Sequence, residues 1–161
     1  MERIYLDYGS ATPIDPRVLD FSKQYLEGIV GNPSSLYSLG LQAKKAMEES
    51  REKISGFINA ENESAIIFTG SATESNNLAI QGCSLRNTDK GKQVAASAIE
   101  HISVLNPMKY LQKIGFRFSV VPVDSQGRID LEQLEQVITK ETIVTSIMYA
   151  NNEIGTIDPI K

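Results

Sequence analysis

Short apolar runs alternate with helix-like stretches through the second part of this 161-residue sequence, and no other feature constrains its fold as strongly. From Ser64 onward the predicted order is strand, helix, strand, helix, strand, helix and strand. The predicted strands cover residues 64–68, 93–97, 116–123 and 142–148. Alternation at this spacing is typical of an α/β layered sheet that is mostly parallel, with helices covering its faces. The last run is rich in β-branched residues, which predicts a strand buried on both faces.

The first part of the chain is predicted to be mainly helical. Ile4–Asp7 is a short strand candidate, and Asp15 is expected to cap a helix that begins at Pro16. Between residues 39 and 58, apolar side chains recur at helical spacing. The opposite face of that helix is charged, and we expect it to be a solvated surface that binds no ligand.

Composition excludes several classes of protein. The formal net charge is −4, so no basic surface argues for nucleic acid or an anionic membrane. No apolar run approaches a membrane span and the N-terminus lacks a signal-peptide layout, so we expect a cytoplasmic protein. The single cysteine, Cys83, and the single histidine, His101, exclude a disulfide framework and metal sites that need several such ligands. We expect Cys83 to be a small buried residue.

A turn rich in small residues, Phe68–Asn77, connects the first of these strands to a helix. Backbone N–H groups at a helix start, together with the positive end of the helix dipole, are suited to binding a phosphate. Gly70 would allow close approach, and the hydroxyls of Ser71 and Thr73 could donate to an anion. The alternative is a plain N-cap that contacts no ligand. The turn taken alone leaves both possibilities open.

Ligand sites in parallel sheets lie at the carboxyl ends of the strands. This rule predicts that three loops share one edge: 69–73, 99–101 and 149–153. The second contains His101 and the third contains the pair Asn151-Asn152. Each also has a structural alternative, because a histidine at a helix start is often a capping residue and an Asn-Asn pair after a strand is commonly a turn. Their agreement on one edge predicts a cofactor site.

These segments also resemble a known family, in the family's own order. The matching pieces are Tyr5-Leu6-Asp7, Thr12–Pro16, Gly31–Ser35 with Gly40, Phe68–Asn77, Glu100-His101 and Asn151–Gly155. Along its whole length the chain resembles the amino-terminal part of pyridoxal-phosphate-dependent cysteine desulfurases of the NifS/IscS type, in the class-V aminotransferase superfamily. The resemblance implies the fold-type I architecture of these transferases. Residues 1–14 would form an amino-terminal segment, and residues 15–161 the first half of the large cofactor-binding domain, with its mostly parallel sheet and helices on both faces.

The resemblance assigns roles to four residues. Ala72 and Thr73 match the positions that bind the phosphate of pyridoxal 5'-phosphate through backbone and hydroxyl groups. His101 matches the imidazole that stacks on the pyridoxal ring and is a candidate for moving substrate protons, so it is the expected catalytic residue. Asn152 matches the amide that hydrogen-bonds the phenolic oxygen of that ring. An imidazole face can lie flat on an aromatic ring, and an amide beside the phenolate can tune the cofactor, so these roles are chemically sensible. No metal is expected.

Three departures from the family pattern concern the surroundings of this site. Gly70 precedes Ser71 where the family usually has Ser-Gly, and Tyr8–Ala11 replaces the usual Asn-Ala-Ala-Thr. Tyr37 stands where a histidine is common. The cofactor residues are unaffected, and the exact substrate preference stays open.

The resemblance also implies residues that this sequence does not contain. They are an Asp and a Gln near the pyridine ring, a lysine that forms an imine with the cofactor, an arginine for the substrate carboxylate and a mobile-loop cysteine that takes the sulfur. Lys140 and Lys161 fall in none of these motifs, and Cys83 lies where the family has no catalytic thiol. We therefore expect an amino-terminal fragment of a cysteine desulfurase that is inactive alone.

The whole enzyme implied by the resemblance converts L-cysteine to L-alanine and an enzyme-bound persulfide, which supplies iron–sulfur or thio-cofactor assembly. A homodimer and an iron–sulfur scaffold or sulfur-acceptor protein are the expected partners. Alternatives are a selenocysteine lyase or another class-V enzyme, one half of a split enzyme, and a non-catalytic scaffold. Truncation is favoured because the last strand and its Asn-Asn-Glu loop lack neighbours to cover the sheet edge. A split enzyme would recover activity when its second half is added, whereas a scaffold would not.

Overall fold

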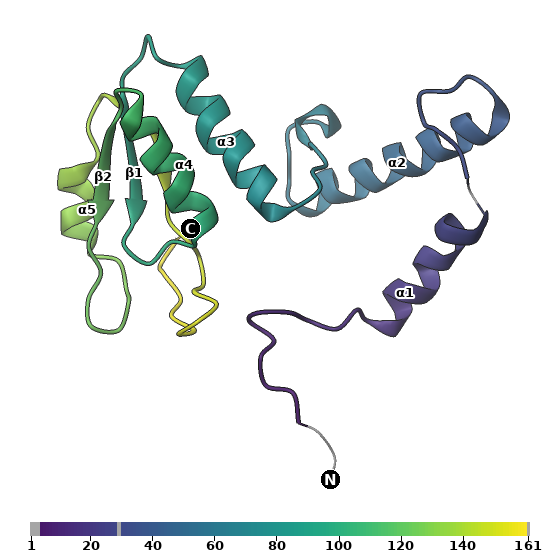
Figure 1. Ribbon diagram of the computed structural model, residues 1–161, viewed down its shortest axis with the longest axis horizontal. Helices are drawn as coiled ribbons and strands as arrows, with labels where there is room; N and C mark the ends of the chain where they lie inside the picture. Colours follow the sequence, from purple (N-terminus) through teal and green to yellow (C-terminus); the bar gives the residue numbers. More distant parts are fainter. Residues whose placement is uncertain (1–3, 29, 161) are drawn as a thin grey trace. The chain divides into compact units, whose positions relative to one another are not determined.

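The chain divides into two compact units, Met1–Phe68 and Thr69–Lys161, in a computed structural model that describes residues 4–28 and 30–160 (Figure 1). Within the described ranges, no helix combines the length and the apolar character needed to cross a membrane. The boundary expected after residue 14 concerns the domains of the whole family protein, and it stays a prediction.

The first unit is built from helices. They are α1 (Pro16–Lys23), the π-helix η1 (Gln24–Gly28), α2 (Ser38–Phe57) and the 3₁₀-helix η2 (Glu63–Ala65). As predicted, α1 begins at Pro16, and the Asp15 carboxylate accepts a hydrogen bond from the backbone N–H of Arg17 at 2.8 Å. The helix predicted over residues 39–58 is also confirmed, because α2 covers nearly the same residues.

Two glycines allow the loop before α2 to lie close to the start of that helix. A Cβ on Gly31 would clash with the carbonyl oxygen of Leu39, and a Cβ on Gly40 would clash with the carbonyl oxygen of Ser35. Backbone therefore packs on backbone at both positions, which no larger residue would permit. This explains why a glycine lies at each of these two points of close approach, Gly31 in the loop and Gly40 in α2.

Two predicted strands of the first unit are wrong. Residues 4–7 form no strand, and the Tyr5 hydroxyl instead donates to the carbonyl of Ala11 at 2.8 Å, across the intervening turn. In the 64–68 run, η2 takes the first residues, and the remainder pairs with no strand among the described residues. The Ile66 carbonyl accepts from Nε of Arg51 at 3.2 Å, and the Arg51 guanidinium lies 5.1 Å from the centre of the Phe68 ring. An apolar run predicts burial or an aromatic contact, but it becomes a strand only when another strand pairs with it.

The second unit alternates helices and strands. They are α3 (Ala72–Arg86), β1 (Gln93–Ser97), α4 (Ile102–Lys113), β2 (Arg117–Val121), α5 (Leu131–Val137) and β3 (Thr142–Ser146). The three strands form a sheet in the order β2-β1-β3, and both pairs are parallel. The predicted parallel α/β sheet is therefore confirmed, with β2 and β3 somewhat shorter than the runs 116–123 and 142–148.

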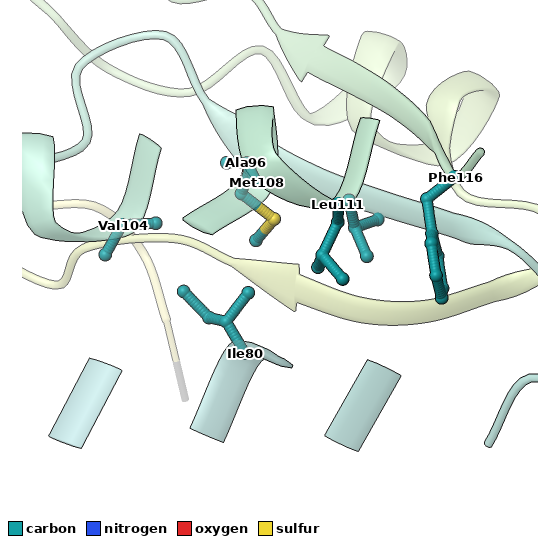
Figure 2. Close-up of a cluster of buried hydrophobic side chains, with 7 residues drawn as sticks. Ile80, Ala96, Val104, Met108, Leu111 and Phe116 are labelled. Carbon is teal, nitrogen blue, oxygen red and sulfur yellow. The ribbon is translucent and has the colours of Figure 1, made fainter. Parts of the chain in front are cut away.

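Helices cover both faces of the central strand. All five residues of β1 are buried, and successive side chains of a strand point to opposite faces, so neither face is open to water. On one face, Val94 and Ala96 belong to a core cluster with side chains of α3 and α4 (Figure 2). On the other face, the Gln93 amide donates to the carbonyl of Val137 in α5 at 2.8 Å. The core members shown in Figure 2 include Ile80, Val104, Met108, Leu111 and Phe116.

Two expectations about burial are wrong. Strand β3 is partly buried rather than buried on both faces, and Thr145 is exposed. The reason is that, among the strands that the structure describes, β3 pairs with β1 alone and so lies at one edge of the three-stranded sheet. Cys83 is exposed as well. The buried residues of α3 are Ile80 and Ser84, which lie four positions apart on one narrow face, and Cys83 lies about 100° around the helix from Ser84.

Candidate functional site

The N-terminus of α3 is capped by its own side chains. Ser71 is the N-cap residue, and its hydroxyl oxygen accepts from the backbone N–H of Glu74 at 3.1 Å. The Glu74 carboxylate accepts in turn from the backbone N–H of Gly70 at 2.8 Å. This reciprocal arrangement is close to a capping box, so Ser71 has the structural role that the N-cap alternative predicted.

The cap leaves the next two residues of α3 with unused donors. Neither the backbone N–H groups of Ala72 and Thr73 nor the Thr73 hydroxyl donates to any acceptor in the described part of the chain. Such first-turn groups add to the positive end of the helix dipole. The start of α3 therefore has the donors that a phosphate group requires, at the two residues expected to bind it.

His101 is the N-cap residue of α4 and is joined to α3 through one serine. Its Nδ1 accepts from the backbone N–H of Ser103 at 3.1 Å and lies 2.8 Å from the Ser103 hydroxyl oxygen. The side-chain amide of Asn76 donates to the same hydroxyl oxygen at 2.8 Å. Because Nδ1 accepts a backbone N–H, it holds a lone pair, and the proton of the neutral ring is on Nε2.

A pocket of about 390 Å³ lies between two of the three loops that the sequence placed on one edge. His101 thus lines a pocket as well as capping a helix. The loop that follows β3 provides the opposite wall. The lining residues are Ile99, Glu100, His101, Ile102, Asn151, Asn152, Glu153 and Ile154.

The two asparagines of that wall have different surroundings. The Asn151 carbonyl oxygen accepts from the backbone N–H groups of Glu153 and Ile154 at 2.8 and 3.1 Å, and its amide donates to the Ile99 carbonyl at 3.2 Å. Asn151 therefore stabilises the turn, as the structural alternative predicted. Asn152 is exposed, and its side chain makes no hydrogen bond with the residues that the structure describes. Its amide is available to a ligand.

The remaining loop, 69–73, lies at the same end of the second unit. Figure 1 shows α3 and α4 starting at the end toward which β1 points, and the Asn76–Ser103 hydrogen bond joins their first turns. The structure therefore brings His101 and Asn152 to one pocket and connects the helix of Ala72 and Thr73 to it. Their contacts with a cofactor stay a prediction.

Glu100 is a site residue to which sequence reasoning gave no role. Its side chain is buried, with 7% exposed, and the carboxylate accepts three hydrogen bonds. The donors are the Ser97 hydroxyl at 2.9 Å, the Ser146 hydroxyl at 3.1 Å and the backbone N–H of Met148 at 2.5 Å. No basic side chain of the described residues forms an ion pair with it. The available clue is a glutamate that lies three residues after a buried strand and directly before the only histidine of the sequence.

A parallel α/β sheet with polar loops gathered at the carboxyl edge of its strands is typical of α/β proteins that bind a ligand at that edge, and comparison with known proteins identifies the family. The class-V aminotransferase family matches residues 4–161, and this chain belongs to it.

Relatives with curated names are similar over nearly the whole chain. The cysteine desulfurase IscS 1 of Archaeoglobus fulgidus is 52% identical over 157 residues, which are 98% of this chain and 41% of the relative. The cysteine desulfurase IscS of Dictyoglomus turgidum is 45% identical over 158 residues, 98% of this chain and 40% of the relative. The chain thus spans about two fifths of the length of these relatives.

Solved structures agree with this assignment. A NifS-like protein superposes with a TM-score of 0.93 at 39% identity, covering 98% of this chain and 43% of that protein. SspA in complex with cysteine gives a TM-score of 0.86 at 35% identity, over 96% of this chain and 44% of SspA. The expected fold-type I architecture is confirmed.

Proposed function

We propose that this chain forms the amino-terminal part of a pyridoxal-phosphate-dependent cysteine desulfurase. The observation that carries the proposal is the 52% identity, over 98% of the chain, to a protein named a cysteine desulfurase. The cysteine bound by SspA supports L-cysteine as the substrate. In the overall reaction, the substrate C–S bond breaks and an S–S bond forms with an acceptor thiol. The thiol hydrogen balances the hydrogen that alanine gains at Cβ, so the products are L-alanine and a persulfide.

The residues at the carboxyl edge of the sheet fit the cofactor. Ala72 and Thr73 have unused donors for its phosphate, His101 offers an imidazole face for its ring, and Asn152 has a free amide for its phenolic oxygen. When bound, pyridoxal phosphate supplies an electron sink for the bonds at the substrate Cα. Because Nδ1 of His101 is occupied by Ser103, any proton that this ring holds for the substrate is held at Nε2.

The same residues would serve a selenocysteine lyase, so that activity is the second candidate within the enzyme class. One half of a split enzyme and a non-catalytic scaffold are the remaining candidates. None of the sixteen basic residues lies in the family's lysine or arginine motif, which favours a chain that is inactive alone. The homodimer, the sulfur-acceptor partner and a cytoplasmic location stay predictions.

Binding of a cofactor analogue tests the cofactor residues directly. The probe is 4'-deoxypyridoxine 5'-phosphate, which lacks the aldehyde and so cannot react with surface lysines, titrated into the 161-residue chain by calorimetry. Thr73→Ala should weaken binding about tenfold, since it removes one hydroxyl donor to a charged group. Thr88→Ala is the matched control, because Thr88 is an exposed threonine just beyond the other end of α3. Equal affinity for both variants, or no binding of the phosphate probe, would contradict the assignment.

The activity is tested by following alanine formation from L-cysteine, together with the sulfide that an added thiol reductant releases from the persulfide. The 161-residue chain alone should form neither product, whereas a native polypeptide from the source cells that contains this sequence and exceeds 17.7 kDa should form both. Selenocysteine as a parallel substrate separates the two enzyme candidates. Product formation by the short chain alone would overturn the prediction of inactivity. A native mass of 17.7 kDa would favour the split enzyme or the scaffold.

A further inference from the structure

The buried carboxylate of Glu100 connects the two loops that line the pocket. Its own loop carries His101 as the next residue, and the Ser97 hydroxyl that it accepts from ends β1. The other two donors belong to the end of β3 and the segment after it, which leads directly into the Asn151-Asn152 turn. One side chain thus joins segments that lie 46 and 48 positions apart in the sequence.

The charge of this carboxylate makes its hydrogen bonds strong enough to hold the connected segments in place. A buried carboxylate without a basic partner is unfavourable unless hydrogen-bond donors replace its lost hydration. Three donors surround Glu100, and two of them, the Ser97 hydroxyl and the Met148 N–H, converge on one carboxylate oxygen. Because bonds to an ionised acceptor are short and strong, they restrict the segment after β3 to a narrow range of positions.

A second, weaker connection joins the same loops. The amide of Asn151 donates to the carbonyl of Ile99 at 3.2 Å, close to the upper end of normal hydrogen-bond distances. Asn151 is only partly buried, whereas Glu100 is almost fully buried. Loss of the Glu100 carboxylate should therefore loosen the pocket without separating its walls.

We propose that Glu100 is a positioning residue that fixes the His101 loop relative to the Asn152 loop. Its consequence for cofactor binding rests on the proposed function, while the loop geometry does not. Glu100 contacts no cofactor in this proposal, and it acts through the backbone that carries the two exposed side chains.

The test compares Glu100→Ala and Glu100→Gln with Gln93→Ala in the 161-residue chain. Gln93 is a matched control because it is also a buried, multiply hydrogen-bonded side chain, but it is the first residue of β1 and so lies at the opposite end of that strand from Glu100. Two readouts are followed in the absence of ligand. They are the imidazole NMR signals of His101, unambiguous because it is the only histidine, and hydrogen exchange of the amides in the 151–155 turn.

Under conditions where every variant is folded, Glu100→Ala should shift the His101 signals and speed exchange in the turn about tenfold or more. Glu100→Gln should change both readouts in the same direction but less, because its carbonyl oxygen can still accept from Met148 and its amide can donate to Ser146, whereas the ionised acceptor is lost. This variant keeps the test decisive if Glu100→Ala does not fold. Gln93→Ala should leave both readouts unchanged. Equal changes in Gln93→Ala and Glu100→Ala, or no change in Glu100→Ala, would overturn the proposal.

Titration with 4'-deoxypyridoxine 5'-phosphate connects this residue to function. Glu100→Ala should weaken binding about tenfold relative to Gln93→Ala, and Glu100→Gln should restore most of the affinity. If the parent chain does not bind the probe, the proposed cofactor site is wrong, while the ligand-free readouts still decide whether Glu100 positions the loops. Weakening of equal size in both alanine variants would show a loss of stability alone.

Discussion

Replacing Gln93 by glutamate probes a buried hydrogen-bond network in which each partner can be assigned. The Gln93 side chain is 2% exposed. Its amide nitrogen donates to the Val137 carbonyl at 2.8 Å and to the Ser119 hydroxyl oxygen at 3.1 Å. Its carbonyl oxygen accepts from the Thr139 hydroxyl at 2.6 Å and from the Arg117 guanidinium. Since the Val137 carbonyl can only accept, the orientation of the amide is fixed.

The magnitude follows from which partners can adapt. In Gln93→Glu, one carboxylate oxygen keeps the bonds from Thr139 and Arg117, and the Ser119 hydroxyl can turn to donate to the other. Only the Val137 carbonyl is left facing an acceptor. One buried polar group without its partner costs about 1–3 kcal/mol, and repulsion between the two oxygens adds to this. The new ion pair with Arg117 offsets part of the cost, so we expect about 1–2 kcal/mol of destabilisation near pH 7.

Hydrogen exchange of the β1 amides, measured with urea unfolding, gives the free energy of opening this region of the second unit. A loss below about 1 kcal/mol near pH 7 would refute the assignment of the amide to Val137. The parent chain, measured at the same pH, supplies the reference.

Two further predictions concern packing and acid stability. Met108 is fully buried in the core, so Met108→Ala should lower the free energy of unfolding by about 3 kcal/mol, against less than about 1.5 for Met108→Leu, as measured by urea unfolding. The backbone N–H groups of Arg128 and Gln126 donate to the Asp124 carboxylate and lower its pKa below the ordinary 3.8. Asp124→Asn should therefore lower the thermal midpoint near pH 6, and this difference should shrink as the pH falls below 3.8 toward the lowered pKa. A difference that stays constant to pH 3 would contradict this.

The elements that sequence predicted well are those whose signals are local. Asp15 caps α1 as expected, because a capping side chain needs only the N–H groups two or three residues away. The prediction for strand 93–97 matches its observed bounds. A central strand covered on both faces has a continuous apolar run, which here is Val94-Ala95-Ala96. Alternation of these local units then restricted the topology to a parallel sheet.

What sequence could not supply depends on partners distant in the chain. The 66–68 segment is extended, but no described strand pairs with it, and Cys83 is exposed because α3 buries so narrow a face. Glu100 shows the same limit of sequence prediction within the site. Its role depends on the hydrogen bond from Met148, which lies 48 positions later in the sequence, and no local pattern predicts a contact at that separation.

At two points of the site, one residue stabilises the local backbone and its neighbour has polar groups that remain for a ligand. Ser71 caps α3, and this leaves the N–H groups of Ala72 and Thr73 free. Asn151 satisfies the turn after β3, and Asn152 keeps an unused amide. At these two points, the capping and turn interpretations therefore apply to Ser71 and Asn151, which are the neighbours of the residues expected to bind the cofactor. Consecutive positions of such a site have different roles, because one side chain satisfies nearby backbone groups and fixes the local conformation while its neighbour's polar group remains for a ligand.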